Sequence, residues 1–91
     1  MPLFMMVCTD KSGALELRKS TREAHLAYVR DTGVVAQAGP LLDDAGEMVG
    51  SLIVLDLPDL NAALGWGEGD PYAKAGLFAD VRVQEWKKVI G

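Results

Sequence analysis

The chain has a single histidine, His25, and imidazole is the side chain best suited to proton transfer near neutral pH. Its spacing to Leu26 and Val29 places it on the inward, apolar side of a predicted helix. A half-buried neutral imidazole can act as a general base or acid, provided that a carboxylate or carbonyl fixes which nitrogen carries the proton. The alternative interpretation is a histidine at the edge of the core that hydrogen-bonds to the backbone.

Asp70 is the carboxylate that could orient this imidazole. It stands directly before Pro71 and Tyr72, and an Asp followed by Pro is typical of the start of a helical turn. In that position the carboxylate could serve only as an N-cap. The residues alone therefore leave a catalytic and a capping role open for Asp70.

Further polar or backbone features could line a pocket. Ser51 interrupts an otherwise apolar strand face, and Tyr72 carries a phenol; each could donate a hydrogen bond to a ligand or simply pack. Gly39 and Pro40 break the alternation of a predicted strand, either as a bulge that lets a ligand approach the backbone or as the end of the strand.

Several other chemistries lack the residues that they need. One His, one Cys and scattered carboxylates exclude a structural zinc site, and neither a metal nor another cofactor is predicted. Gly65, Gly67 and Gly69 follow a predicted helix rather than a strand, which excludes a dinucleotide-binding phosphate loop. Cys8 lies inside a predicted strand and is expected to be a packed core thiol. A nucleophile-elbow motif is absent from the sequence.

The predicted helices are defined by capping residues and glycines. The main helix is expected to begin at Ser20, which forms a capping box with Glu23, and to end at Gly33. Residues 14–19 are good helix formers without a cap and predict a short helical lead-in. A second helix follows the N-cap Asp59.

Gly65 and Gly67 are expected to weaken and then end that second helix. A single helical turn is predicted from Asp70 to Gly76.

The predicted strands come from short apolar runs bounded by turn residues, and they cover residues 3–9, 34–42, 48–57 and 77–85. The element order is then βαββαβ, the α+β ferredoxin-like pattern, with an antiparallel sheet and both helices on one face. Two of the strands, 3–9 and 48–57, are apolar on both sides. We therefore expect the uncovered sheet face to pack on a second copy, which makes a homodimer.

Length and composition set the outer bounds. The chain has 91 residues and 9.8 kDa, which fits one domain over residues 1–91. The net charge of −4 argues against a nucleic-acid partner, because phosphate backbones are anionic. No apolar run reaches the ~18 residues of a membrane span, and no basic segment of a secretory signal is present at the start. With one unpaired cysteine, the predicted location is the cytoplasm.

Taken together, several segments make the sequence resemble the YciI-like family, also called YCII-related proteins, over essentially its whole length. They are Arg22-Glu23-Ala24-His25-Leu26, Ala38-Gly39-Pro40-Leu41, Gly50-Ser51, Trp66 before Asp70-Pro71-Tyr72, Ala75-Gly76-Leu77 and Trp86-Lys87-Lys88-Val89. The glycine-rich stretch at residues 65–69 departs from the family pattern, where a firmer helix is expected.

This resemblance implies a dimeric ferredoxin-like α+β barrel with a pocket in each subunit. It implies that His25 and Asp70 form an acid/base pair, and that Ser51, Tyr72, Gly39 and Pro40 line the pocket. The first functional hypothesis is an enzyme that transfers protons on a small organic molecule, in isomerase-like or lyase-like chemistry, with Asp70 orienting His25.

Two alternatives remain from the sequence. The first is a non-catalytic dimer that binds a small molecule or serves as an accessory module, with the His25–Asp70 pair as a structural hydrogen bond. The second is a purely structural interaction protein, which predicts that no ligand-sized pocket lies at His25. The resemblance assigns no substrate.

Overall fold

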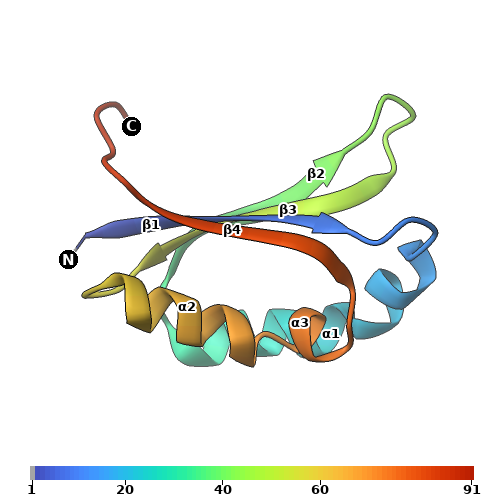
Figure 1. Cartoon of the computed structure of the whole chain (residues 1–91), viewed down its shortest axis with the longest axis horizontal. Helices are drawn as coiled ribbons and strands as arrows, with labels where there is room; N and C mark the ends of the chain where they lie inside the picture. Colours follow the sequence, from blue (N-terminus) through green and yellow to red (C-terminus); the bar gives the residue numbers. More distant parts are fainter. Residues whose placement is uncertain (1) are drawn as a thin grey trace.

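A four-stranded antiparallel sheet with all helices on one face is the frame of the molecule (Figure 1). The structure, a computed structural model, describes residues 2–91. Its elements are β1 (Leu3–Asp10), α1 (Leu15–Thr32), β2 (Val35–Leu42), β3 (Met48–Asp56), α2 (Leu60–Gly69), α3 (Pro71–Lys74) and β4 (Phe78–Trp86). The strand order is β2-β3-β1-β4. This confirms the predicted α+β ferredoxin-like fold.

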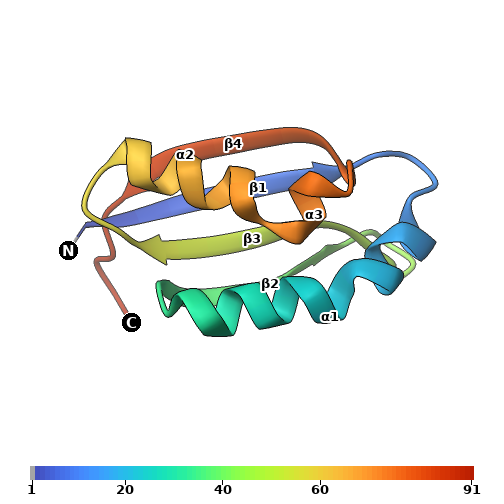
Figure 2. The same ribbon diagram turned by 90° about the horizontal axis from the view of Figure 1, so that it is seen from below.

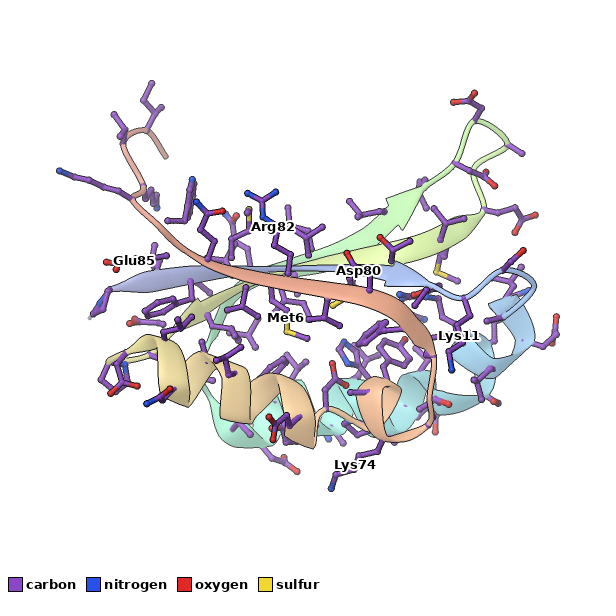
Figure 3. The ribbon with its side chains drawn as sticks, viewed as in Figure 1. Met6, Lys11, Lys74, Asp80, Arg82 and Glu85 are labelled. Atoms are coloured by element: carbon purple, nitrogen blue, oxygen red, sulfur yellow. The ribbon has the colours of Figure 1, made fainter. Side chains whose placement is uncertain are left out.

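The core lies between the sheet and the helices. Alternate residues of β1 point toward the helices, as Figure 3 shows for Met6, and the opposed residues of β3 do the same because Met6 pairs with Ile53. The buried cluster consists of Phe4, Met6, Cys8, Ile53, Leu55, Ala63 and Trp66. Each large apolar side chain in it contributes about 1.5–3 kcal/mol to stability.

Helix α1 begins at Leu15, so the predicted start at Ser20 was wrong. The Ser20 hydroxyl donates to the Leu17 carbonyl at 3.0 Å inside the helix, and the actual N-cap, Ala14, makes no side-chain cap. The lead-in residues are part of the helix, and one of them, Arg18, forms an ion pair with Asp10 at the end of β1. Gly33 ends the helix with a left-handed backbone, φ 65°, as predicted.

Helix α2 continues through the predicted stop at Gly67 and ends at Gly69. Asp59 caps it as predicted and accepts a hydrogen bond from the Ala62 N–H at 2.8 Å. Asp70 then caps α3, accepting from the Tyr72 N–H at 3.0 Å. The glycine-rich stretch is therefore helical up to the residue before Asp70.

Strand β2 passes through Gly39 and Pro40 without ending or bulging there. Gly39 pairs with Leu52 and Pro40 with Ser51, and the register shifts only nearer the two ends of the strand. Both predicted explanations for this dipeptide, a bulge and a strand end, were therefore wrong. β2 is an edge strand, the position in a sheet where proline is tolerated.

Contacts between Tyr28, Thr32 and Trp66 fasten α1 to α2, which cross the same face of the sheet (Figure 2). The Tyr28 hydroxyl donates to the Trp66 carbonyl at 2.7 Å, and the indole N–H of Trp66 donates to the Thr32 hydroxyl at 2.9 Å. The ring centroids of Tyr28 and Trp66 lie 4.9 Å apart. These contacts fix the end of α2, and with it Asp70, relative to α1.

The hydrogen bond between Tyr28 and the Trp66 carbonyl requires glycine at position 69. A Cβ at Gly69 would lie 2.5 Å from the Tyr28 hydroxyl oxygen, whereas a Cβ at Gly65 would meet nothing within 4 Å. We expect Gly69→Ala to lower the free energy of unfolding by about 1–3 kcal/mol, because the Tyr28 ring must shift and lose its hydrogen bond. The matched control Gly65→Ala should raise it by about 0.5–1 kcal/mol, since alanine is the better helix former. Urea denaturation measures both, and equal effects would contradict this account.

Over most of its width, the face of the sheet opposite the helices is covered by no other element of residues 2–91 (Figure 1). Arg82 lies on this open face, which is the side away from Met6 (Figure 3). Strand alternation places Val7 and Leu52 there as well, and Leu52 is 38 % exposed. No helix within residues 2–91 is long and apolar enough to cross a membrane.

Candidate active site

The structure brings His25 and Asp70 into contact although 45 positions separate them. The Nδ1 atom of His25 lies 2.8 Å from Oδ1 of Asp70, and both side chains are buried. His25 comes from the middle of α1, and Asp70 from the junction of α2 and α3. The same Asp70 oxygen also caps α3, so the two roles that the sequence left open occur together. The alternative in which His25 hydrogen-bonds to the backbone is wrong, because the ring bonds to the Asp70 side chain.

This contact fixes the orientation and tautomer of the imidazole. A neutral ring bonded to a carboxylate at Nδ1 carries its proton there, which leaves the lone pair on Nε2. Within residues 2–91, Nε2 of His25 has no hydrogen-bond partner, and His25 lines a cavity. The arrangement can accept a proton at Nε2 and stabilise the resulting imidazolium through Asp70.

A cavity of ≈ 140 Å³ opens between α1 and the edge strand β2. It is lined by Arg18, Arg22, His25, Leu26, Val29, Ala38, Gly39, Pro40, Met48 and Tyr72. Of the residues predicted to line a pocket, Gly39, Pro40 and Tyr72 therefore do so. Ser51 lies outside this lining, and Asp70 lies behind His25.

Tyr72 packs on the face of the His25 imidazole. Its ring stacks on His25 with centroids 4.1 Å apart and an angle of 17° between the planes. Burial raises the pKa of Tyr72, although the charges of Arg18 and Arg22 oppose that rise. The phenol therefore stays protonated near neutral pH and can donate a hydrogen bond, for which residues 2–91 provide no acceptor, and Tyr72 is one of the residues that line the cavity.

Ser51 supports Arg18 instead of lining the cavity. The Arg18 guanidinium donates to the Ser51 hydroxyl at 2.7 Å, and to the two carboxylate oxygens of Asp10 at 2.7 and 3.1 Å. Burial lowers the pKa of Arg18, but the hydrogen bond and charge of Asp10 outweigh it and the pKa is raised. The guanidinium carbon lies 4.7 Å from the centre of the Tyr72 ring. Arg18 thus connects Asp10 and Ser51 to Tyr72.

Sequence reasoning missed Asp10, Arg18 and Arg22. Arg18, Arg22 and His25 are spaced four and three residues apart, the spacing of one helix face. This spacing becomes visible only when the helix is extended back to Leu15, because the apparent capping box at Ser20 left Arg18 outside the predicted main helix.

Cys8 is a buried core thiol, as predicted. Burial, followed by the nearby carboxylate of Asp70, raises the pKa of Cys8 to about 12. The sulfur is therefore protonated near neutral pH and is no nucleophile. No group of three or more potential metal ligands occurs among residues 2–91.

The family of the chain is set by a match to the model of the YCII-related domain over residues 2–87. The chain belongs to the YCII-related family. Protein YciI of Escherichia coli O6:H1 is 36% identical over 96 residues, covering 96% of this chain and 98% of that protein. An uncharacterized protein of Haemophilus influenzae is 33% identical, covering 94% of this chain and 97% of its own length.

Solved structures extend this comparison. The 5-chloro-2-hydroxyhydroquinone dehydrochlorinase of Burkholderia phenoliruptrix, in complex with 2,5-dihydroxybenzoquinone, superposes with a TM-score of 0.84. It is 33% identical, and the match covers 93% of each chain. An antibiotic biosynthesis monooxygenase at 13% identity and TM-score 0.61 shares the fold alone.

Proposed function

We propose that this YCII-related protein is an enzyme that transfers protons on a small organic molecule, in isomerase-like or lyase-like chemistry. The observation that carries the proposal is the 2.8 Å contact between His25 Nδ1 and Asp70 Oδ1, beside a cavity that His25 lines. A carboxylate-oriented imidazole with a free Nε2 is suited to accept and return a proton near neutral pH.

In the proposed reaction, Nε2 of His25 removes a proton from carbon, and Asp70 stabilises the imidazolium. The electron pair of the broken C–H bond moves toward an adjacent carbonyl, whose oxygen becomes negative. Tyr72 donates a hydrogen bond to this oxygen, a role for which it is better placed than Ser51, because Ser51 lies outside the cavity. Return of the proton at another carbon gives isomerisation, and departure of a leaving group gives elimination.

The dehydrochlorinase supports this proposal. It is a relative with 33% identity over 93% of the chain, and dehydrochlorination, the net loss of HCl, combines proton transfer with the departure of a leaving group, as the elimination branch of the proposed mechanism does. A separate part of the proposal concerns location: we propose that the protein lies in the cytoplasm, because Cys8 is unpaired.

A second candidate function is a non-catalytic module that binds a small molecule. The observation in its favour is that Asp70 Oδ1 also accepts the Tyr72 N–H, so the His25–Asp70 pair joins α1 to α3. This candidate predicts that substitutions of either residue lower the melting temperature. The purely structural interpretation has no role for the cavity beside His25.

Two reactions test the proposal. The first is the exchange of the carbon-bound hydrogens of 2,5-dihydroxybenzoquinone with solvent deuterium, measured by NMR. The second is the release of chloride from 5-chloro-2-hydroxyhydroquinone. Wild type is expected to accelerate at least one of these reactions above the level of His25→Gln. Arg30→Gln, which alters an exposed charge on the same helix, is the matched control and should behave as wild type. Identical rates with wild type and His25→Gln for both compounds would contradict the enzymatic proposal.

The proposal includes a second copy of the chain on the open face of the sheet. Leu52 is 38 % exposed there, and the strand alternation of β1 and β3 makes this face apolar. Sedimentation is expected to give a mass near twice 9.8 kDa at micromolar concentration. Leu52→Glu should shift the protein toward monomer, whereas Leu64→Glu, at an exposed site on α2, should not. A wild-type mass near 10 kDa would contradict the dimer.

A further inference from the structure

The charged side chains on the cavity wall are all cationic. Arg18 and Arg22 line it, and the lining contains no Asp or Glu, although the whole chain has a net charge of −4. The nearby carboxylates of Asp10 and Asp70 lie behind this wall, bonded to Arg18 and His25. A ligand in the cavity therefore meets positive charge first.

We propose that the cavity binds a small organic anion of about the size of one ring, and that Arg22 holds its negative oxygen. This names the substrate class of the site described under the proposed function and rests on that function. Carboxylates and ionised phenols or enols share the chemistry that would be recognised, a negative oxygen on a compact carbon skeleton.

The two arginines differ in what they offer a ligand. Arg18 is buried, and its charge is compensated by the two hydrogen bonds to Asp10. Arg22 lies one helical turn later, is exposed, and has no ion pair or hydrogen bond within residues 2–91. Its guanidinium is near enough to Tyr72 to lower the pKa of the phenol against the effect of burial. Arg22 therefore supplies the uncompensated charge on the wall of the cavity that Tyr72 also lines.

The size of the cavity limits the ligand. Its volume is ≈ 140 Å³, and a protein cavity of about 150 Å³ is known to hold one benzene molecule. Leu26, Val29, Pro40 and Met48 supply apolar lining for a carbon skeleton. A single ring with one or two negative oxygens matches this volume and this lining.

Binding of an anion would also serve the proton transfer. With the negative oxygen on Arg22 and Tyr72, the carbon skeleton lies in the same cavity as His25. Negative charge that develops on the substrate when Nε2 removes a proton would be stabilised by the same donors. Arg22 would thus act on binding and on the reaction.

The inference is tested by NMR titration with three probes, using the ring signals of the only histidine as the readout. The probes are benzoate, the dianion of 2,5-dihydroxybenzoquinone, and benzamide as the neutral analogue of benzoate. We expect at least one anion to shift the His25 signals and to bind about 10-fold or more tightly than benzamide. Benzoate and the quinone dianion distinguish a carboxylate site from a phenolate or enolate site.

Variants assign the effect to Arg22. Arg22→Gln should weaken binding of the anion about 10-fold and leave benzamide unchanged, and Arg22→Lys should recover part of the loss. Arg30→Gln removes a charge from the same helix outside the cavity lining and should have no effect.

Failure of this inference is distinct from failure of the proposed function. Benzamide binding as tightly as both anions, unaltered anion binding by Arg22→Gln, or no binding of either anion would each overturn it. The proton-transfer proposal is judged separately, by the exchange and chloride-release rates of wild type against His25→Gln.

Discussion

Replacement of His25 by glutamine is expected to lower the catalysed rate by about 10²–10⁴, the usual contribution of a positioned general base. Glutamine keeps a polar group of similar length but cannot take up a proton at the position of Nε2. Asp70→Asn is expected to cost nearly as much, because an amide does not stabilise the imidazolium that forms during the reaction. The measurement is the deuterium-exchange rate on 2,5-dihydroxybenzoquinone.

The double variant gives the sharper result. If Asp70 acts through His25, the variant with both substitutions should be no slower than His25→Gln alone, because the two residues work as a unit. Two independent contributions would instead multiply.

The melting temperature separates catalysis from structure: a large fall in both single variants, with unchanged rates, would favour the binding module. The ¹⁵N shifts of the His25 ring provide a check, since the geometry assigns the proton of the neutral ring to Nδ1.

The strands and the end of the main helix could be predicted because their signals are local. Short apolar runs bounded by turn residues placed every strand to within a residue or so at each end, and Gly33 ended α1 where the sequence indicated. The start of α1 could not be placed, because Ser20 and Glu23 imitate a capping box. One of the residues that extend the helix to Leu15 is Arg18, which is bound to Asp10, a contact that no local pattern reveals.

The contact between His25 and Asp70 could be predicted, but the position of Ser51 relative to the cavity could not. The helical spacing marked His25 as inward-facing, and the resemblance paired it with Asp70, which the 2.8 Å contact brings together. The sequence placed Ser51 on an otherwise apolar strand face, and Ser51 is buried in the structure. Alternation gives a face and not a distance from the cavity, so the insertion of the Arg18 guanidinium between Ser51 and the cavity could not be foreseen.

The largest expected loss of stability follows from breaking the Arg18–Asp10 pair. Its side chains are only 3% and 6% exposed, and the Nε–Oδ2 distance is 2.7 Å. Arg18→Met leaves the Asp10 carboxylate buried without its cation, and we expect the free energy of unfolding to fall by about 3–5 kcal/mol. Urea denaturation of the single variant measures this. Arg18→Met combined with Asp10→Leu should be more stable than Arg18→Met alone, because no uncompensated charge is then left in the interior.

The same helix offers a matched control. Glu16 and Lys19 also form an ion pair, but at 4.0 Å and with side chains 90% and 54% exposed, so Glu16→Gln should have no measurable effect. Since Asp10 holds Arg18 at the first turn of α1, we expect Arg18→Met to expose the amides of residues 15–19 to hydrogen exchange before those around His25. Uniform loss of protection along α1, or a change as small as that of Glu16→Gln, would contradict the view that this ion pair sets where the helix begins.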